Sequence, residues 1–296
     1  MPPIRPLSLI LLLLTGCQTM TARSPTPVAI PVVAPEAGPT ANDNLNAMVW
    51  LHSSVEYRLV AGQIWRSALA PLDKAIKTPD WDALAKDERD TPARGLAPAI
   101  IVDVDETVLD NAPSTVRAIR ERREFNEAAW GQWVSERKAK PLAGSFEFLN
   151  AAAKQGVTVF YITNRDASLA ADTIANLRSA GFPVAKDTQV LGLGTVVDGC
   201  EQEGSEKSCR RQLVGRTHRV LMQFGDQVGD FVQIQANTPE GRAAAVAPYT
   251  AWIGERWFVL PNPMYGSWEP ALFDNNWRQP PGVRRAAKEA ALDDAK

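Results

Sequence analysis

Three short runs of apolar and β-branched residues divide the middle of the chain, at residues 99–102, 157–162 and 219–224. Runs of this length without polar alternation are typical of strands that are buried on both faces of a parallel sheet. Apolar positions at helical spacing lie between them and end before Gly156 and Gly181, which suit the left-handed turn after a helix. This alternation of strand and helix predicts an α/β fold with a doubly wound parallel sheet.

The amino-terminal end of the chain has the composition of a targeting segment. Its only long apolar run is too short to span a bilayer as a helix but long enough for a secretory signal. Two small residues precede Cys17, which predicts a lipoprotein signal peptide over residues 1–16 and lipidation of Cys17; an ordinary signal peptide with an incidental cysteine is the alternative. Residues 17–43 are rich in proline and are expected to form an extended tether.

The rest of the chain is assigned to one domain, residues 44–283, and a charged tail, residues 284–296. Apolar positions from Leu45 to Leu69 recur at helical spacing, so we expect a helix there that packs on the main core. The insert at about 112–142, after the first strand, is expected to form a small, mainly helical cap.

Composition and charge limit the kinds of ligand and metal site. The chain has 32 basic and 34 acidic residues, and this net charge of −2 argues against a nucleic-acid polymer as a partner and favours a small ligand. Its three cysteines and two histidines form neither Cys-x-x-Cys nor His-x-x-x-His, which argues against a zinc centre of thiolates or imidazoles. A catalytic metal is therefore expected to be bound by oxygen atoms.

Polar residues that can perform chemistry follow the first two predicted strands. Asp103 and Asp105 come directly after the first, and residues two apart on a strand project to the same side. The carboxyl ends of parallel strands form the ligand crevice, so both acids are expected there; alternatively they only cap a turn. Thr163 and Asn164 follow the second strand before a helix, where anions are favoured, and are expected to bind phosphate.

Two further carboxylates follow the third predicted strand. Gly225 permits a tight exit from the strand, and Asp226 and Asp230 are one helical turn apart. Together with Asp103 they predict an oxygen-rich pocket of the kind that Mg²⁺ prefers. Without a cation, these clustered carboxylates would repel one another and a phosphate group.

The order of these motifs resembles the four motifs of the haloacid dehalogenase (HAD) superfamily. The closer similarity is to the bacterial class C acid phosphatases, which are lipoprotein phosphatases that include 5′-nucleotidases. The lipoprotein signal agrees with that resemblance, which extends over most of the mature chain. The similar segments are residues 103–113, Trp130 with Trp133, residues 161–165 and 181–183, Lys207 with Arg210, and residues 225–231 and 261–269.

The resemblance implies catalytic roles for two residues and phosphate binding by three. Asp103 would be the nucleophile that forms an aspartyl-phosphate, and Asp105 would be the general acid and base. Thr163, Asn164 and Lys207 would hold the phosphoryl oxygens. Lys207 has two alternatives, since it could belong to a solvated charge cluster and Arg210 could replace it.

The resemblance also implies a set of metal ligands. Mg²⁺ would be bound by the Asp103 carboxylate, the Asp105 backbone carbonyl, Asp226 and Asp230. Gln18, directly after Cys17, resembles the sorting pattern of outer-membrane lipoproteins.

The expected protein is a lipid-anchored, Mg²⁺-dependent acid phosphatase of the bacterial envelope, in the outer membrane, that hydrolyses small phosphomonoesters, with nucleoside 5′-monophosphates as the expected substrates. The alternatives are a broad-specificity phosphatase or phosphotransferase without nucleotide preference, and a non-catalytic surface-binding lipoprotein. The candidates to stack on a base are Phe125, Trp130, Trp133, Tyr265 and Trp268, although Trp130 and Trp133, three apart on a helix, could instead be core residues. Residues 112–115 lack the aromatic residue usual in the family. The sequence leaves open the oligomeric state and whether Cys200 and Cys209 form a disulfide.

Overall fold

The computed structural model describes residues 43–295. The predicted signal peptide, Cys17 and all but the last residue of the predicted tether lie outside the described residues. Among the residues that are described, no helix has both the length and the apolar character needed to cross a bilayer.

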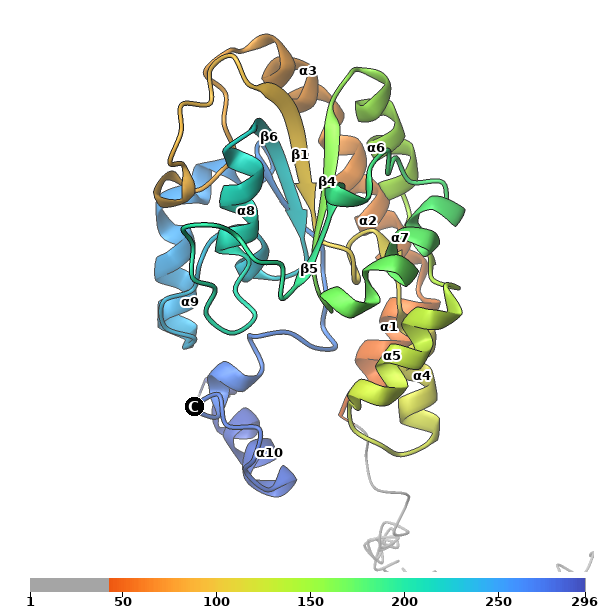
Figure 1. Cartoon of the computed structure of the whole chain (residues 1–296). Coiled ribbons are helices and arrows are strands. Elements are labelled where there is room, and N and C mark those ends of the chain that lie inside the picture. Colours follow the sequence, from red (N-terminus) through yellow and green to blue (C-terminus); the bar gives the residue numbers. More distant parts are fainter. Residues whose placement is uncertain (1–42, 296) are drawn as a thin grey trace, which may run out of the picture. The chain divides into compact units, whose positions relative to one another are not determined.

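A parallel sheet of five strands forms the centre of the molecule, in the order β5-β4-β1-β6-β7 (Figure 1). The strands are β1 (Ala97–Val102), β4 (Thr158–Asp166), β5 (Val190–Leu193), β6 (His218–Gly225) and β7 (Trp257–Val259). Strands β1, β4 and β6 contain the three apolar runs of the sequence. At the end of β1, Val102 pairs with Tyr161 of β4 and with Phe224 of β6, so these three strands end near the same edge of the sheet.

Helices lie on both sides of this sheet, which confirms the predicted doubly wound α/β fold (Figure 1). The helices on one side are α2 (Val55–Ser67), α3 (Leu69–Lys77), α6 (Ser145–Lys154) and α7 (Ala170–Ser179), and those on the other are α8 (Ser208–Gly215) and α9 (Pro239–Val246). The short 3-10 helices are Lys86–Glu88, Ala167–Leu169, Asp187–Gln189, Val228–Asp230, Ala247–Trp252 and Pro270–Leu272. Gly181 has a φ of +85°, as the predicted left-handed turn after α7 requires.

A stack of aromatic rings supports the end of β6 from within the core. Trp65 of α2 is fully buried and lies parallel to Phe224, with 4.1 Å between the ring centroids. Phe224 stacks in turn on Phe258 of β7, at 4.8 Å. Such contacts add to the free energy gained from burying the rings. Because Phe224 directly precedes the loop that carries Asp226 and Asp230, this packing fixes the start of that loop.

The single amino-terminal helix predicted from Leu45 to Leu69 is wrong. The segment forms α1 (Leu45–Ser53), α2 and the start of α3, because Ser54 is extended and caps α2 by accepting a hydrogen bond from Tyr57 N at 3.0 Å. The helical periodicity restarts at this break, so Leu59, which was expected in the core, is 60% exposed while Tyr57 is buried.

The insert after β1 contains two helices, α4 (Ala112–Arg120) and α5 (Glu127–Glu136). They are enclosed by a short antiparallel pair, β2 (Leu109–Asp110) and β3 (Lys140–Pro141). Helix α1 contacts α4. These are the elements that occupy the insert for which a cap is predicted.

The carboxyl-terminal segment contains helix α10 (Pro281–Ala290), which begins before the predicted start of the charged tail. Arg284 of this helix is buried and donates to Glu124 at 2.7 Å. Its guanidinium also lies over the ring of Trp277, 5.2 Å from the centroid. The tail is therefore fixed to the domain through at least one arginine.

Cys200 and Cys209, whose pairing the sequence leaves open, form a disulfide. Cys209 lies in the first turn of α8. The loop that the disulfide closes contains Lys207, so the bond restricts the conformations of the segment that carries this lysine.

Candidate active site

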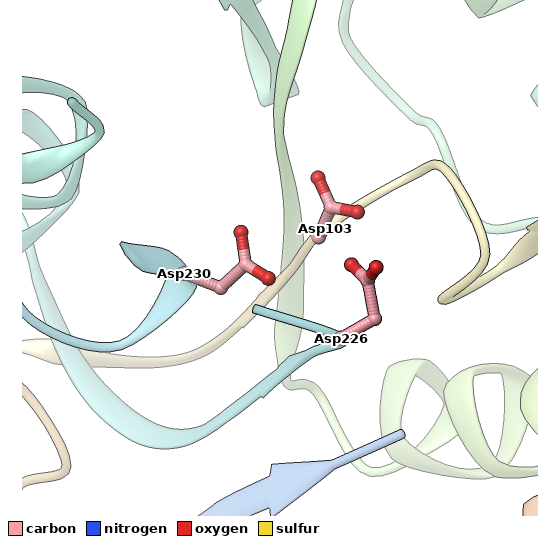
Figure 2. A group of neighbouring side chains, drawn as sticks. All are labelled: Asp103, Asp226 and Asp230. Atoms are coloured by element: carbon pink, nitrogen blue, oxygen red, sulfur yellow. The ribbon is translucent and has the colours of Figure 1, made fainter. Parts of the chain in front are cut away.

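Three carboxylates meet at the carboxyl edge of the sheet. Asp103 follows β1, and Asp226 and Asp230 follow β6. Figure 2 shows that their side chains point toward one another, and each has an oxygen within 4.8 Å of the oxygens of the other two. The backbone N–H of Asp103 donates to Phe224 O at 2.9 Å, which extends the pairing of β1 with β6 up to the first acid.

Hydrogen bonds from the surrounding loops orient the two carboxylates that follow β6. Asp226 accepts from the side chains of Gln227 and Asn262, each at 2.8 Å. Asp230 accepts from the backbone N–H of Gln227 at 2.8 Å. A Cβ atom on Gly225 would lie only 2.3 Å from the Asp230 Cβ, so the close approach of this acid requires glycine at position 225.

Lys207 lies inside the carboxylate cluster and is almost completely buried. Its Nζ donates to Asp103 Oδ1 and, at 2.6 Å, to Asp230 Oδ1. Burial by itself lowers the pKa of a lysine, but the two carboxylates raise the pKa of Lys207 above its ordinary value. Lys207 is therefore not part of a solvated charge cluster, and it remains positively charged at neutral pH.

The negative charge of the cluster exceeds what one lysine can balance. Burial raises the pKa of Asp103 well above its ordinary value, and the neighbouring Asp230 and Asp226 raise it further, against the opposing effect of Lys207. Burial, reinforced by Asp230, raises the pKa of Asp226 to about 7. A divalent cation between these oxygens would stabilise the ionised forms.

The residues at the cluster fit a magnesium ion by their chemistry. Asp103, Asp226 and Asp230 each offer a carboxylate oxygen as a metal ligand, and these three oxygens are close enough together to bind one ion. Mg²⁺ prefers hard oxygen ligands and retains several waters, so three protein ligands leave positions for a phosphate oxygen.

Asp105 has different neighbours from Asp103, although both were expected to face one group. Because β1 ends at Val102, strand alternation no longer determines where these two side chains point. Asp105 accepts from Asn111 Nδ2 at 2.7 Å, from Thr163 Oγ1 at 3.2 Å, and from Arg165 Nε and Nη2 at 3.0 and 2.8 Å. The Asp105 side chain is partly accessible, whereas Asp103 is buried.

The two residues expected to bind phosphate after β4 differ in their surroundings. Thr163 is buried, and its hydroxyl donates to Asp105 and accepts from the backbone N–H of Arg165. Asn164 is exposed, and its Oδ1 accepts from Arg210 Nη2 at 2.8 Å. Arg210 also donates to Thr163 O at 2.5 Å and to Glu206 O at 3.0 Å, so it joins the end of β4 to the loop that carries Lys207.

Several polar contacts at the site were not predicted from the sequence. Arg165 lies in a segment similar to the family, residues 161–165, but was given no role; it is buried and makes a bidentate ion pair with Asp105. Glu106 is buried, and it accepts from the Tyr265 hydroxyl. The position of Arg165 directly after Thr163 and Asn164, the pair expected to bind phosphate, was a usable signal. The contact of Glu106 with Tyr265, in contrast, joins residues too far apart in sequence for any local pattern.

The comparisons with known proteins agree with this geometry. The chain matches the family model for the HAD superfamily, subfamily IIIB (acid phosphatase), over residues 46–268. Its fold is similar to that of the class C acid phosphatase from Bacillus anthracis with tungstate bound, with a TM-score of 0.73 and 29% identity over 86% of this chain and 98% of that chain. A second structure of the class C acid phosphatase from Bacillus anthracis gives a TM-score of 0.72 at 30% identity, with the same coverage of both chains.

Plant proteins also share part of the sequence. Acid phosphatase 1 of Solanum lycopersicum is 30% identical over 166 residues, which are 56% of this chain and 57% of that protein. The stem 31 kDa glycoprotein of Glycine max is 28% identical over 171 residues, or 58% of its length. The chain thus spans little more than half the length of these relatives. The family model covers most of the domain that carries the carboxylate cluster, and the chain belongs to the acid phosphatases of HAD subfamily IIIB.

Proposed function

We propose that the protein is a Mg²⁺-dependent phosphomonoesterase that works through an aspartyl-phosphate on Asp103. The observation that carries this proposal is the buried contact of Asp103 with Lys207 beside Asp226 and Asp230, at the edge of the sheet where ligands of α/β proteins bind. Membership of the subfamily IIIB acid phosphatases supports the same reaction.

In the first step, a carboxylate oxygen of Asp103 forms a bond to phosphorus while the bond from phosphorus to the ester oxygen breaks. The electron pair of the broken bond stays on the ester oxygen, which takes a proton from the Asp105 carboxyl group and leaves as an alcohol. In the second step, Asp105 takes a proton from a water molecule, and the water oxygen forms a bond to phosphorus. The bond from phosphorus to the Asp103 oxygen breaks, which releases phosphate and restores the Asp103 carboxylate.

The surrounding groups stabilise the charge that develops on the transferring phosphoryl oxygens. Lys207, Thr163 and the loop at Asn164 hold these oxygens, and Lys207 also reduces the repulsion between the phosphate and Asp103. Mg²⁺, held by the carboxylates of Asp103, Asp226 and Asp230 and by the Asp105 carbonyl, would neutralise charge on the phosphoryl group. Lys207 therefore positions both the nucleophile and the substrate.

Replacing Asp103 by Asn removes the nucleophile while keeping its size, so phosphate release from small phosphomonoesters should fall by roughly 10³-fold or more. The measurement is release of inorganic phosphate with Mg²⁺ present, with circular dichroism to confirm folding. Asp187→Asn, which changes an exposed carboxylate paired with Arg178, is the control and should keep full activity. Substantial Mg²⁺-stimulated turnover by D103N would refute the mechanism, and an inactive wild-type protein would favour the surface-binding lipoprotein.

The raised pKa of Asp226 predicts how the metal-free protein depends on pH. In the unfolded chain this group titrates near its ordinary value of 3.8, and in the folded chain near 7, so the folded state binds more protons between these values. Protonation of Asp226 therefore adds to the free energy of unfolding most fully below about pH 4, and this contribution is lost as the pH rises through about 7. Asp226→Asn should flatten this part of the profile, measured as melting temperature in the presence of a chelator.

The same variant tests metal binding without reference to activity. At pH 7, Mg²⁺ should raise the melting temperature of the wild-type protein by several degrees, because it binds the folded state and removes the repulsion among the carboxylates. D226N should gain much less. An equal increase for both proteins would mean that the ion binds elsewhere.

We further propose that nucleoside 5′-monophosphates are the preferred substrates. Two aromatic residues contact residues next to Asp105 or bound to it. The Tyr265 hydroxyl donates to Glu106, and the Arg165 guanidinium lies over the Trp130 ring, 5.5 Å from its centroid. Aromatic faces at these positions can stack on a base. Broad specificity and transfer to an alcohol remain the competing functions.

A substrate panel separates these possibilities. For a nucleotide-preferring enzyme, kcat/KM should be about tenfold or more higher for AMP than for ribose 5-phosphate and an aryl phosphate, since only AMP offers a base for stacking. Equal values would reject a preference for nucleotides. Added alcohol that diverts phosphate into a new ester would instead identify a phosphotransferase.

We also propose that the chain is anchored in the bacterial envelope, in the outer membrane, by lipid on Cys17. Cys17→Ser should move the protein from the membrane fraction to the soluble fraction of the envelope, because one or more acyl chains supply the attachment. The measurement is fractionation after expression of the full chain. Unchanged membrane association of C17S would disprove the anchor without affecting the proposed reaction.

A further inference from the structure

A chain of hydrogen bonds links helix α5 to Asp105. The indole Nε1 of Trp133 donates to Asn111 Oδ1 at 2.8 Å, and Asn111 Nδ2 donates to Asp105 Oδ1 at 2.7 Å. Trp133 is 3% exposed and Asn111 is 2% exposed, so water has little access to these contacts. From the sequence, Trp133 is a candidate either for base stacking or for a core position, and Asn111 is a candidate for a role in the turn.

The indole group determines which way the Asn111 amide faces. An indole N–H can donate but cannot accept a hydrogen bond, so it requires the amide oxygen on its side. Arg165 Nη2, which also only donates, lies 3.3 Å from the same oxygen. The amide nitrogen of Asn111 is therefore turned toward Asp105. The reversed amide would place its oxygen against a carboxylate and its nitrogen against two donors.

The donor Trp133 is itself held firmly in place. Its ring packs in the main hydrophobic core, and the guanidinium of Arg117 lies over it at 5.1 Å from the ring centroid. The backbone N–H of Asn111 donates to Glu106 Oε1 at 2.9 Å. Both ends of the Trp133–Asn111 contact are thus fixed by packing and by hydrogen bonds.

We infer that Trp133 is a positioning residue for proton transfer and that it acts through Asn111 on the carboxyl group of Asp105. This inference rests on the proposed function, in which Asp105 protonates the ester oxygen as the bond from phosphorus to that oxygen breaks. Without the indole N–H, the Asn111 oxygen keeps only the longer contact with Arg165, at 3.3 Å, and the orientation of the amide is less restricted. Asp105 then loses one of its oriented donors and samples positions from which it cannot reach the ester oxygen.

The chemistry of the leaving group distinguishes this role from a general loss of structure. An alkoxide leaving from an alkyl phosphate needs a proton, whereas 4-nitrophenolate leaves as a stabilised anion and depends little on a general acid. The kinetic constant to compare is kcat/KM, because it reports the steps up to formation of the aspartyl-phosphate and excludes its later hydrolysis.

The test compares Trp133→Phe with the wild-type protein on glycerol 3-phosphate and 4-nitrophenyl phosphate. W133F keeps the ring and removes the donor, so kcat/KM should fall about tenfold for the alkyl ester and less than threefold for the nitrophenyl ester. Trp81→Phe is the matched control: Trp81 is equally buried, and its indole donates to Leu221 O in the core at 2.8 Å. W81F should change kcat/KM by the same factor for both substrates.

A second variant keeps the inference testable if W133F does not fold. Asn111→Asp has nearly the same shape, accepts from Trp133, and no longer donates to Asp105 as an amide, so it should show the same selective loss on the alkyl ester. In an N111D background, W133F should leave the ratio of the two kcat/KM values unchanged. Equal losses on both esters in W133F and N111D would overturn the inference but leave the proposed reaction intact. Failure of the wild-type protein to hydrolyse either ester would remove both.

Discussion

The structure of the site depends on one constraint, which is the mutual repulsion of buried carboxylates that lie close together. Asp103, Asp226 and Asp230 come within reach of one ion at the edge of the sheet, and Lys207 supplies the only buried ammonium group in direct contact with them among the residues described. Desolvation and repulsion raise the pKa values of Asp103 and Asp226, so the arrangement costs free energy unless a cation or protons neutralise it. The same unfavourable state favours the binding of a divalent ion by the cluster.

The first turn of α8 joins the parts of the molecule that this cluster requires. Lys207 contacts the carboxylates, and Cys209 closes the preceding loop through its disulfide with Cys200. Arg210 is fully buried and donates to the end of β4, while Arg211, also fully buried, pairs with Glu88 and donates to Gly229 O at 2.6 Å. Neighbouring residues thus connect the lysine, the end of β4 and the loop that carries Asp230. Buried charges require such partners, since breaking one contact leaves the other charge unpaired.

Much of the fold and part of the candidate site could be predicted from the sequence, because the signals were local. The strands β1, β4 and β6 are uninterrupted apolar runs, and the acids that follow β1 and β6 necessarily meet where parallel strands end at one edge. The break at Ser54 escaped prediction because serine is compatible with a helix interior and only its hydrogen bond to Tyr57 marks it as a cap. The link from Trp133 through Asn111 to Asp105 escaped for a different reason: Trp133 reaches Asn111 through tertiary packing, which leaves no periodicity in the chain.

The different surroundings of Asp103 and Asp105 explain how two identical side chains, two residues apart, can take different roles. Asp103 is buried between Lys207 and two other acids, which are the surroundings that the proposed nucleophile and metal ligand would need. Asp105 lies outside that cluster, is partly accessible, and is surrounded by donors from Asn111, Thr163 and Arg165. A nucleophile needs fixed geometry and neutralised charge, whereas a group that gives and then takes a proton needs access to the leaving oxygen and to water. The turn after Val102 separates the two acids into these environments, and helix α5 contacts the second of them through Asn111.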